Sequence, residues 1–111
     1  MIIKSRSAGE VLIFEISGEI NIQTVTRLKR SFTKALSGAQ KIVINLKNAE
    51  YIDSTGLASL IETMKQIEKK GGMLCLTDIP PKVRMLLEIT KLDKLFVIYD
   101  TEEAALKRLA A

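Results

Sequence analysis

Histidine is absent from this chain of 111 residues. Its absence rules out Ser-His-Asp and Cys-His catalysis and removes the commonest metal ligand. The one cysteine, Cys75, cannot form an internal disulfide, which fits a reducing cytoplasm. Without histidine nearby, a reactive thiol is not expected, and we expect Cys75 to pack in the core. We therefore expect a cytoplasmic binding protein that is not an enzyme and needs no cofactor or metal.

Long apolar stretches are also missing. The longest apolar runs have four or five residues, whereas a membrane-spanning helix needs about 20. Two isoleucines precede Lys4 at the N-terminus, without the charge, apolar stretch and cleavage site of a signal peptide. We expect no membrane insertion and a single domain over residues 1–111, because 47% hydrophobic and 27% charged residues are typical of one globular unit.

Aromatic residues are few, and the basic residues are not concentrated in one segment. The chain has three phenylalanines and two tyrosines, and its 17 basic and 13 acidic residues give a net charge of +4. A nucleic-acid-binding protein concentrates its basic residues and often interleaves aromatics among them. Here both signs of charge are interspersed along the chain, so we expect a solvated surface and no direct nucleic-acid binding.

Hydrophobic periodicity predicts alternating strands and helices. Five strands are expected, over residues 2–5, 11–16, 42–46, 73–76 and 96–99. Four helices are expected: one capped by Asn21, one carrying Leu57, Leu60, Ile61, Met64 and Ile67, one starting at Pro80 and Pro81, and one capped by Thr101. We interpret residues 17–21 and 47–52 as loops, and Met64, Met73 and Met85 as core filler.

The order of these elements predicts an α/β fold. The first two strands are close enough for an antiparallel hairpin, and strands joined through helices run parallel. We therefore expect a mostly parallel mixed sheet of about five strands, with helices packed against it. Function in such a sheet lies at the carboxyl ends of the strands. Two loops, around Asn21 and Ser54, leave such ends and should be neighbours.

One short segment, Asp53-Ser54-Thr55-Gly56, links a buried strand to the central helical pattern. Asp, Ser and Thr accept hydrogen bonds from the free N–H groups of a first helical turn. Gly56 has no side chain to block an approach from outside. The segment thus presents a serine hydroxyl at a helix N-terminus beside a carboxylate. The alternative is that Ser54 or Asp53 is only a helix cap.

The run Asp53-Ser54-Thr55-Gly56-Leu57 resembles the signature of the STAS domain in bacterial anti-sigma-factor antagonists, and the resemblance extends over nearly the whole chain. It implies the same α/β architecture. It also implies that Ser54 is phosphorylated by an anti-sigma factor that is itself a serine kinase. The unphosphorylated protein would bind that factor and free a sigma factor. Phosphorylation would end the complex, and a separate phosphatase would restore the serine.

The resemblance also implies a partner-binding surface, made of Asn21, Asp53, Ser54, Thr55, Gly56, Leu57 and Ala58. Two of these depart from the family pattern: Asn21 stands where aspartate is usual, and Ala58 replaces a second glycine. Both departures bear on which partner docks and how efficiently it phosphorylates. Other uses of such a domain are a scaffold subunit of a sensory assembly, an accessory subunit of a membrane transporter, or a small-ligand sensor.

Overall fold

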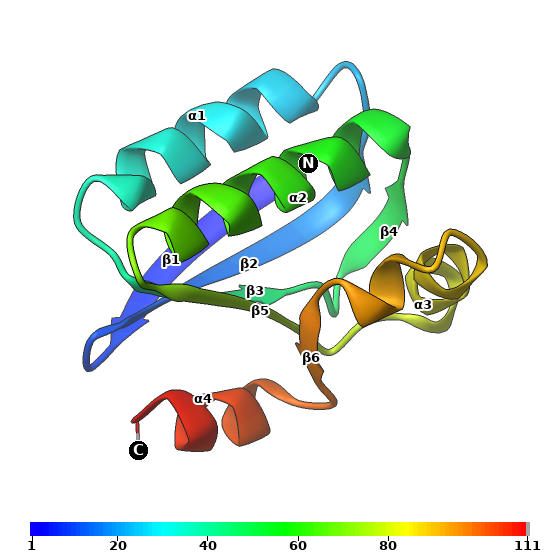
Figure 1. Cartoon of the computed structure of the whole chain (residues 1–111). Coiled ribbons are helices and arrows are strands. Elements are labelled where there is room, and N and C mark those ends of the chain that lie inside the picture. The colour runs from blue at the N-terminus through cyan, green and yellow to red at the C-terminus, as the bar shows by residue number, and fades with distance from the viewer. Residues whose placement is uncertain (111) are drawn as a thin grey trace.

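A mixed six-stranded sheet runs through the molecule, and the computed structural model describes it over residues 1–110 (Figure 1). The strands are β1 (Ile2–Ala8), β2 (Val11–Ile20), β3 (Lys41–Asn45), β4 (Ala49–Ile52), β5 (Met73–Thr77) and β6 (Val97–Tyr99). The order is β1-β2-β3-β5-β6, and β4 pairs with β2 outside this path. Only β1 is antiparallel to its neighbour; the other pairs are parallel, as predicted.

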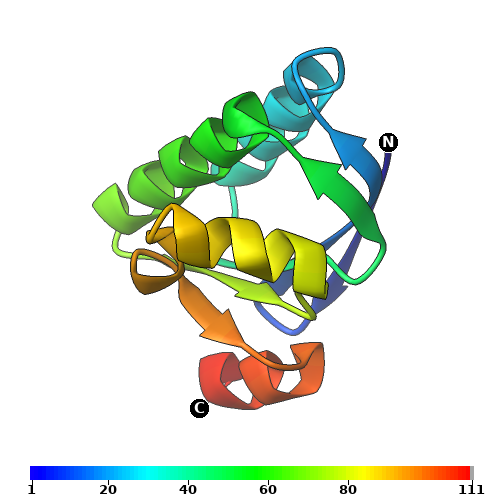
Figure 2. The same cartoon turned by 90° about the vertical axis from the view of Figure 1, so that its right-hand side faces the viewer.

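Within residues 1–110, four helices cover the two faces of the sheet. They are α1 (Val25–Leu36), α2 (Ser54–Lys69), α3 (Pro81–Ile89) and α4 (Glu102–Ala110), with a short 3-10 turn η1 (Leu92–Lys94) after α3. Side chains of α1, α2 and α3 share one core against the sheet, whereas α4 packs on the opposite face (Figures 1 and 2). No helix within residues 1–110 is both long and apolar enough to cross a bilayer.

The larger core lies under the first three helices and includes Phe14 and Phe32, whose rings meet edge to face with centroids 5.3 Å apart. A smaller cluster under α4 contains Cys75. The N-terminus of α4 is held to the sheet through Glu102, which accepts hydrogen bonds from the side chains of Arg6 and Asn45. The two clusters show that the sheet is apolar on both faces where helices cover it.

Two predicted loops are strands in the structure. β4 lies in the segment interpreted as a loop, so the sheet has six strands where about five were expected, and β2 extends through residues 17–20. Buried and exposed residues do not alternate along β4, because Glu50 and Tyr51, in its middle, are both exposed. In β2, Gly18 has a φ of +85° and sits where the register with β4 shifts. In the sequence, a glycine at such a position is read as a turn residue, although here it belongs to a strand.

The helix starts follow the predicted capping residues in two cases and differ in a third. Asp53 caps α2, and the Thr101 hydroxyl accepts from the N–H of Ala104 in α4. Asn21, predicted to cap the first helix, instead caps a turn that precedes it. Its side-chain oxygen accepts from the N–H groups of Gln23 and Thr24, and α1 begins only at Val25.

Candidate functional site

The candidate site lies where β2 and β4 end side by side. Ile20 and Ile52 are paired across these parallel strands, and the N–H of Asp53 donates to the carbonyl of Ile20 at 3.0 Å. The chain leaves β2 through the turn at residues 21–24 and leaves β4 directly into α2. The two loops around Asn21 and Ser54 are therefore neighbours, as the order of elements predicts.

The carboxylate of Asp53 ties these two loops together. One oxygen, Oδ1, accepts from the hydroxyl of Thr55 at 2.6 Å and from the N–H of Gly56 at 3.0 Å. The other, Oδ2, accepts from the N–H of Ile22 at 3.0 Å. The Thr55 hydroxyl, followed by the N–H groups of Gly56 and Ile22, holds the pKa of Asp53 below its usual range. The group is therefore ionised at neutral pH.

Ser54 is the first residue of α2, and it is exposed. Asp53 occupies the N-cap position, so of the two candidate caps it is Asp53, and not Ser54, that caps the helix. The two hydroxyls of the segment are not equivalent, because Thr55 is half-buried and already donates to Asp53. The structure thus presents one accessible hydroxyl, that of Ser54, at the positive end of a 16-residue helix.

Gly56 is required by packing inside the molecule. A Cβ atom built on it would lie 2.7 Å from Cγ2 of Ile20 and 2.7 Å from Cγ1 of Ile52. Real Cβ atoms do not make such contacts, so glycine lets α2 begin directly against the two strands. The sequence led us to expect that Gly56 leaves room for an approach from outside. The structure adds a requirement inside the protein, where Ile20 and Ile52 pack against Gly56.

The seven residues of the predicted partner-binding set divide by exposure. Ser54 and Ala58 are exposed, and Asn21, Asp53 and Thr55 are half-buried. Gly56 is buried, and Leu57 is 6% exposed and packs in the core. These two residues can shape the surface only by holding α2 in place, because both are buried and unavailable to a partner.

Whole-chain comparison assigns the protein to a family. Residues 3–105 match the sequence model of the STAS domain. The chain belongs to the STAS domain family. An anti-sigma F factor antagonist of Paenibacillus polymyxa is 37% identical to it over 101 residues, which cover 89% of this chain and 86% of that protein.

Solved structures agree with this assignment. An anti-sigma factor antagonist from Mycobacterium paratuberculosis has a TM-score of 0.90 at 26% identity, over 99% of this chain and 94% of that one. The anti-sigma factor antagonist SpoIIAA, solved in its unphosphorylated form, has a TM-score of 0.79 at 19% identity, over 99% of both chains. At that identity the likeness to SpoIIAA concerns the fold alone, and the STAS-like α/β architecture expected from the sequence is confirmed.

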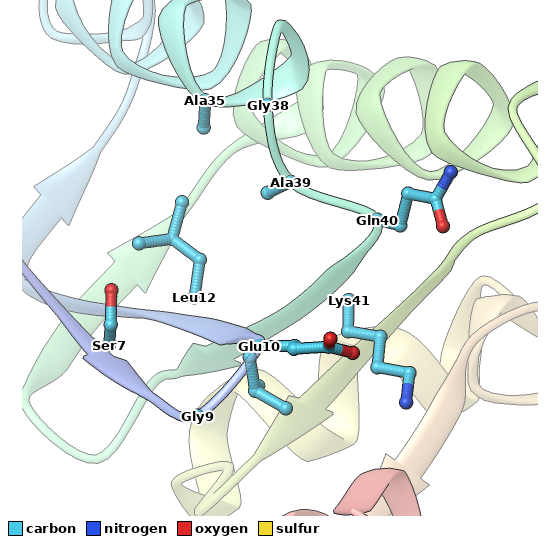
Figure 3. A pocket seen from close by; sticks show the side chains of 10 residues that line it. Ser7, Gly9, Glu10, Leu12, Ala35, Gly38, Ala39, Gln40 and Lys41 are labelled. Atoms are coloured by element: carbon cyan, nitrogen blue, oxygen red, sulfur yellow. The ribbon is translucent and has the colours of Figure 1, made fainter.

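A separate hollow of this STAS domain lies at the other end of the sheet. It measures about 630 Å³ and is lined by the β1–β2 turn and the connection from α1 to β3. Figure 3 shows Leu12 pointing toward Ala35 and Ala39 across this hollow. Glu10 and Lys41 also line it, so its walls mix charged and apolar groups. None of the predicted site residues borders it.

Sequence reasoning missed an apolar surface beside Ser54. Met85 and Ile89 on α3 are 61% and 72% exposed, and Tyr51 of β4 is 53% exposed. The interpretation of Met85 as core filler is therefore wrong, and Met73, which is 40% exposed, belongs to neither core cluster. One signal was present in the sequence: Met85 and Ile89 fall off the helical face that carries Val83 and Leu87.

Neither cysteine nor a cluster of metal-ligating side chains forms a second reactive site within residues 1–110. Cys75 is buried, and burial raises the pKa of its thiol to about 11, so the reactive thiolate is scarce at neutral pH. Within residues 1–110, histidine, cysteine, aspartate and glutamate side chains form no group of three that could hold a metal ion.

Proposed function

We propose that this STAS domain is an anti-sigma factor antagonist that binds its anti-sigma factor through the surface around Ser54. The observation that carries the proposal is the exposed Ser54 hydroxyl at the first position of α2, beside a carboxylate locked by three hydrogen bonds. The relative from Paenibacillus polymyxa, matched over most of both chains, supports the same partner class. The protein acts in the cytoplasm as a binding protein, not as an enzyme.

We further propose that the anti-sigma factor is a serine kinase that phosphorylates Ser54 and so ends the complex. The partner supplies ATP, magnesium and catalysis, and this chain supplies the hydroxyl and the docking surface. A phosphatase reverses the modification. A phosphoserine adds a charge of about −1.5 to −2, and the free N–H groups of the first helical turn accommodate an anion. The fold therefore tolerates the modification.

The effect of the phosphate falls on the complex. The ionised Asp53 lies next to Ser54 in the chain. A dianion beside this carboxylate must be desolvated when a partner covers it, and the two negative charges repel each other. Binding to a surface that fits a neutral hydroxyl is therefore weakened, whereas α2 itself stays folded.

A pair of variants tests the proposal. Ser54→Asp places a carboxylate at the first helical position, where the dipole favours it, so stability should change by no more than about 1 kcal/mol. Its affinity for the anti-sigma factor should fall by about 2 kcal/mol, or roughly 30-fold. Ser54→Ala should bind as the wild type does and take no phosphate. Thermal melting and calorimetry on both variants check these values.

The site of modification is tested separately. After incubation with the anti-sigma factor and ATP, tandem mass spectrometry should find one phosphate, on Ser54 and not on Thr55. Thr55→Ser, which keeps the hydroxyl bonded to Asp53, is the matched control and should be modified at Ser54 as before. Phosphate on residue 55 alone, or a folded Ser54→Asp variant that binds at wild-type affinity, would contradict the proposal.

A further inference from the structure

Two apolar residues are exposed on the outward side of α3, beside the charged Lys82 and Glu88. Met85 and Ile89, one helical turn apart, are 61% and 72% exposed, while Val83 and Leu87 on the inner side are 3% and 1% exposed. A helix with apolar residues on both sides is normally buried on both sides. The outer side of α1 is different, since the exposed Arg27, Lys29, Arg30 and Lys34 occupy it. α3 therefore exposes a pair of large apolar side chains that the outer side of α1 lacks.

This face forms one wall of a groove, and β4 forms the other. Tyr51 and Ile52 of β4 line the groove together with Val83, Met85 and Ile89 of α3. Figure 2 shows α3 beside β4, which runs up into α2. The groove measures about 240 Å³, the volume of roughly eight water molecules. That is enough for one or two large aliphatic side chains.

We propose that this groove receives large apolar side chains from the same anti-sigma factor molecule that binds at Ser54, and this inference rests on the proposed function. The short distance between the groove and Ser54 supports this inference. Tyr51 precedes Ser54 by three residues, so their Cα atoms are at most about 10 Å apart. A standard interface buries about 800 Å² on each partner, a disc roughly 30 Å across. A partner that covers Ser54 with an interface of this size also covers the groove.

The rim of the groove identifies the chemistry of its occupant. Among the described residues that line the groove, Lys82 is the one that carries a charge. An apolar segment flanked by an acidic residue satisfies both the groove and this ammonium group. A second copy of the chain is the competing occupant, but a symmetric pairing brings two Lys82 side chains and two chains of net charge +4 together. The observations therefore favour the anti-sigma factor.

Two charge substitutions test the groove. Met85→Glu and Ile89→Glu place a carboxylate on exposed positions of α3, so both variants should melt within a few degrees of the wild type. Their calorimetric affinity for the anti-sigma factor should fall about 30-fold or more, the loss typical of a central anchor residue. With ATP, KM for phosphorylation of Ser54 should rise similarly, whereas kcat should be unchanged because the hydroxyl is untouched. Ile2→Glu, at a 60% exposed isoleucine on β1, is the matched control and should bind as the wild type does.

The possible results distinguish a failure of the groove inference from a failure of the proposed function at Ser54. If the two variants bind and are phosphorylated like the wild type, the groove is not part of the interface, although the proposed function stands. If sedimentation shows a wild-type dimer that Ile89→Glu dissociates with unchanged partner affinity, a second copy is the occupant and the inference is wrong. If the wild type itself neither binds the anti-sigma factor nor gains phosphate, the proposed function fails first. Should either glutamate variant unfold, the milder pair Met85→Ala and Ile89→Ala replaces it, with a loss of about tenfold expected.

Discussion

Two regions at opposite ends of the sheet, the turn at Gly38 and the segment around Gly56, differ in the room that they leave for a side chain. A hollow of about 630 Å³ lies at the amino end (Figure 3), and a Cβ atom added to Gly38 beside it would meet no atom within 4 Å. At the carboxyl end Gly56 has no room for a Cβ atom, and the Asp53 carboxylate joins two loops. The candidate site is at the carboxyl end. It therefore does not coincide with the large hollow, and it depends on the close approach of α2 to β2 and β4.

Helix direction explains why the carboxyl end of the sheet suits a phosphorylated serine. α2 begins at the carboxyl end, where its free N–H groups and positive dipole face Ser54. α1 ends near the amino end, where its carbonyls attract cations instead: the ammonium of Lys70 donates to the carbonyl of Leu36. Only one of the two ends therefore stabilises a new negative charge.

Gly56→Ala should have the largest effect on stability. The added methyl group overlaps Ile20 and Ile52, and overpacking of this kind costs about 1–3 kcal/mol. The melting temperature should fall by roughly 5–15 °C, since 1 kcal/mol corresponds to several degrees in a domain of this size. Gly38→Ala, beside the hollow at the amino end, is the matched control. Its stability should be unchanged or should rise by up to about 1 kcal/mol. Equal losses in both variants would remove the contrast between the two ends.

Asp53→Asn should have a smaller effect that depends on pH. The amide oxygen can still cap α2, but an amide N–H₂ group then faces the N–H of Ile22, so the melting temperature at pH 7 should fall. The pKa of Asp53 is lowered in the folded state. The stability that its charge contributes is therefore present above its unfolded pKa of about 3.9 and lost as pH falls through the folded value.

The difference between wild type and Asp53→Asn should accordingly narrow as pH falls from about 5 to below 3. This comparison isolates Asp53, because Glu102 is present in both proteins, and hydrogen bonding to Arg6 lowers its pKa too. Melting curves over that pH range provide the measurement. A constant gap would mean that the Asp53 charge contributes nothing to holding the two loops together.

Asn21→Asp should have the smallest effect on the fold and a specific effect on the partner. Aspartate can accept from the same N–H groups of Gln23 and Thr24, so the melting temperature should change little. If a charge at this position aids kinase docking, phosphorylation of Ser54 should become faster. Gln40→Glu makes a similar change of charge at the amino end of the sheet and should leave the rate unaltered. A rate that stays equal or falls in Asn21→Asp would show that another contact replaces the family's charge.

Much of the candidate site could be predicted because its signals are local. The helical spacing after Asp53 and the capping preference of Asp, Ser and Thr place the segment at the start of α2. The alternation of strands and helices then brings Asn21 to the same end of the sheet. Which residue caps the helix could not be predicted, since Asp53 and Ser54 are equally suitable by type, and the backbone geometry assigns the role to Asp53.

By itself, the sequence determined the α/β order, the parallel sheet and the segment around Ser54, because burial repeats along each strand and helix with a local period. The tertiary structure alone decided three features: β4, the need for glycine at position 56, and the groove between Tyr51 and α3. Each depends on residues far apart in the chain. β4 exists because the end of β2 offers free hydrogen-bonding groups, and the groove forms only when α3 packs beside Tyr51.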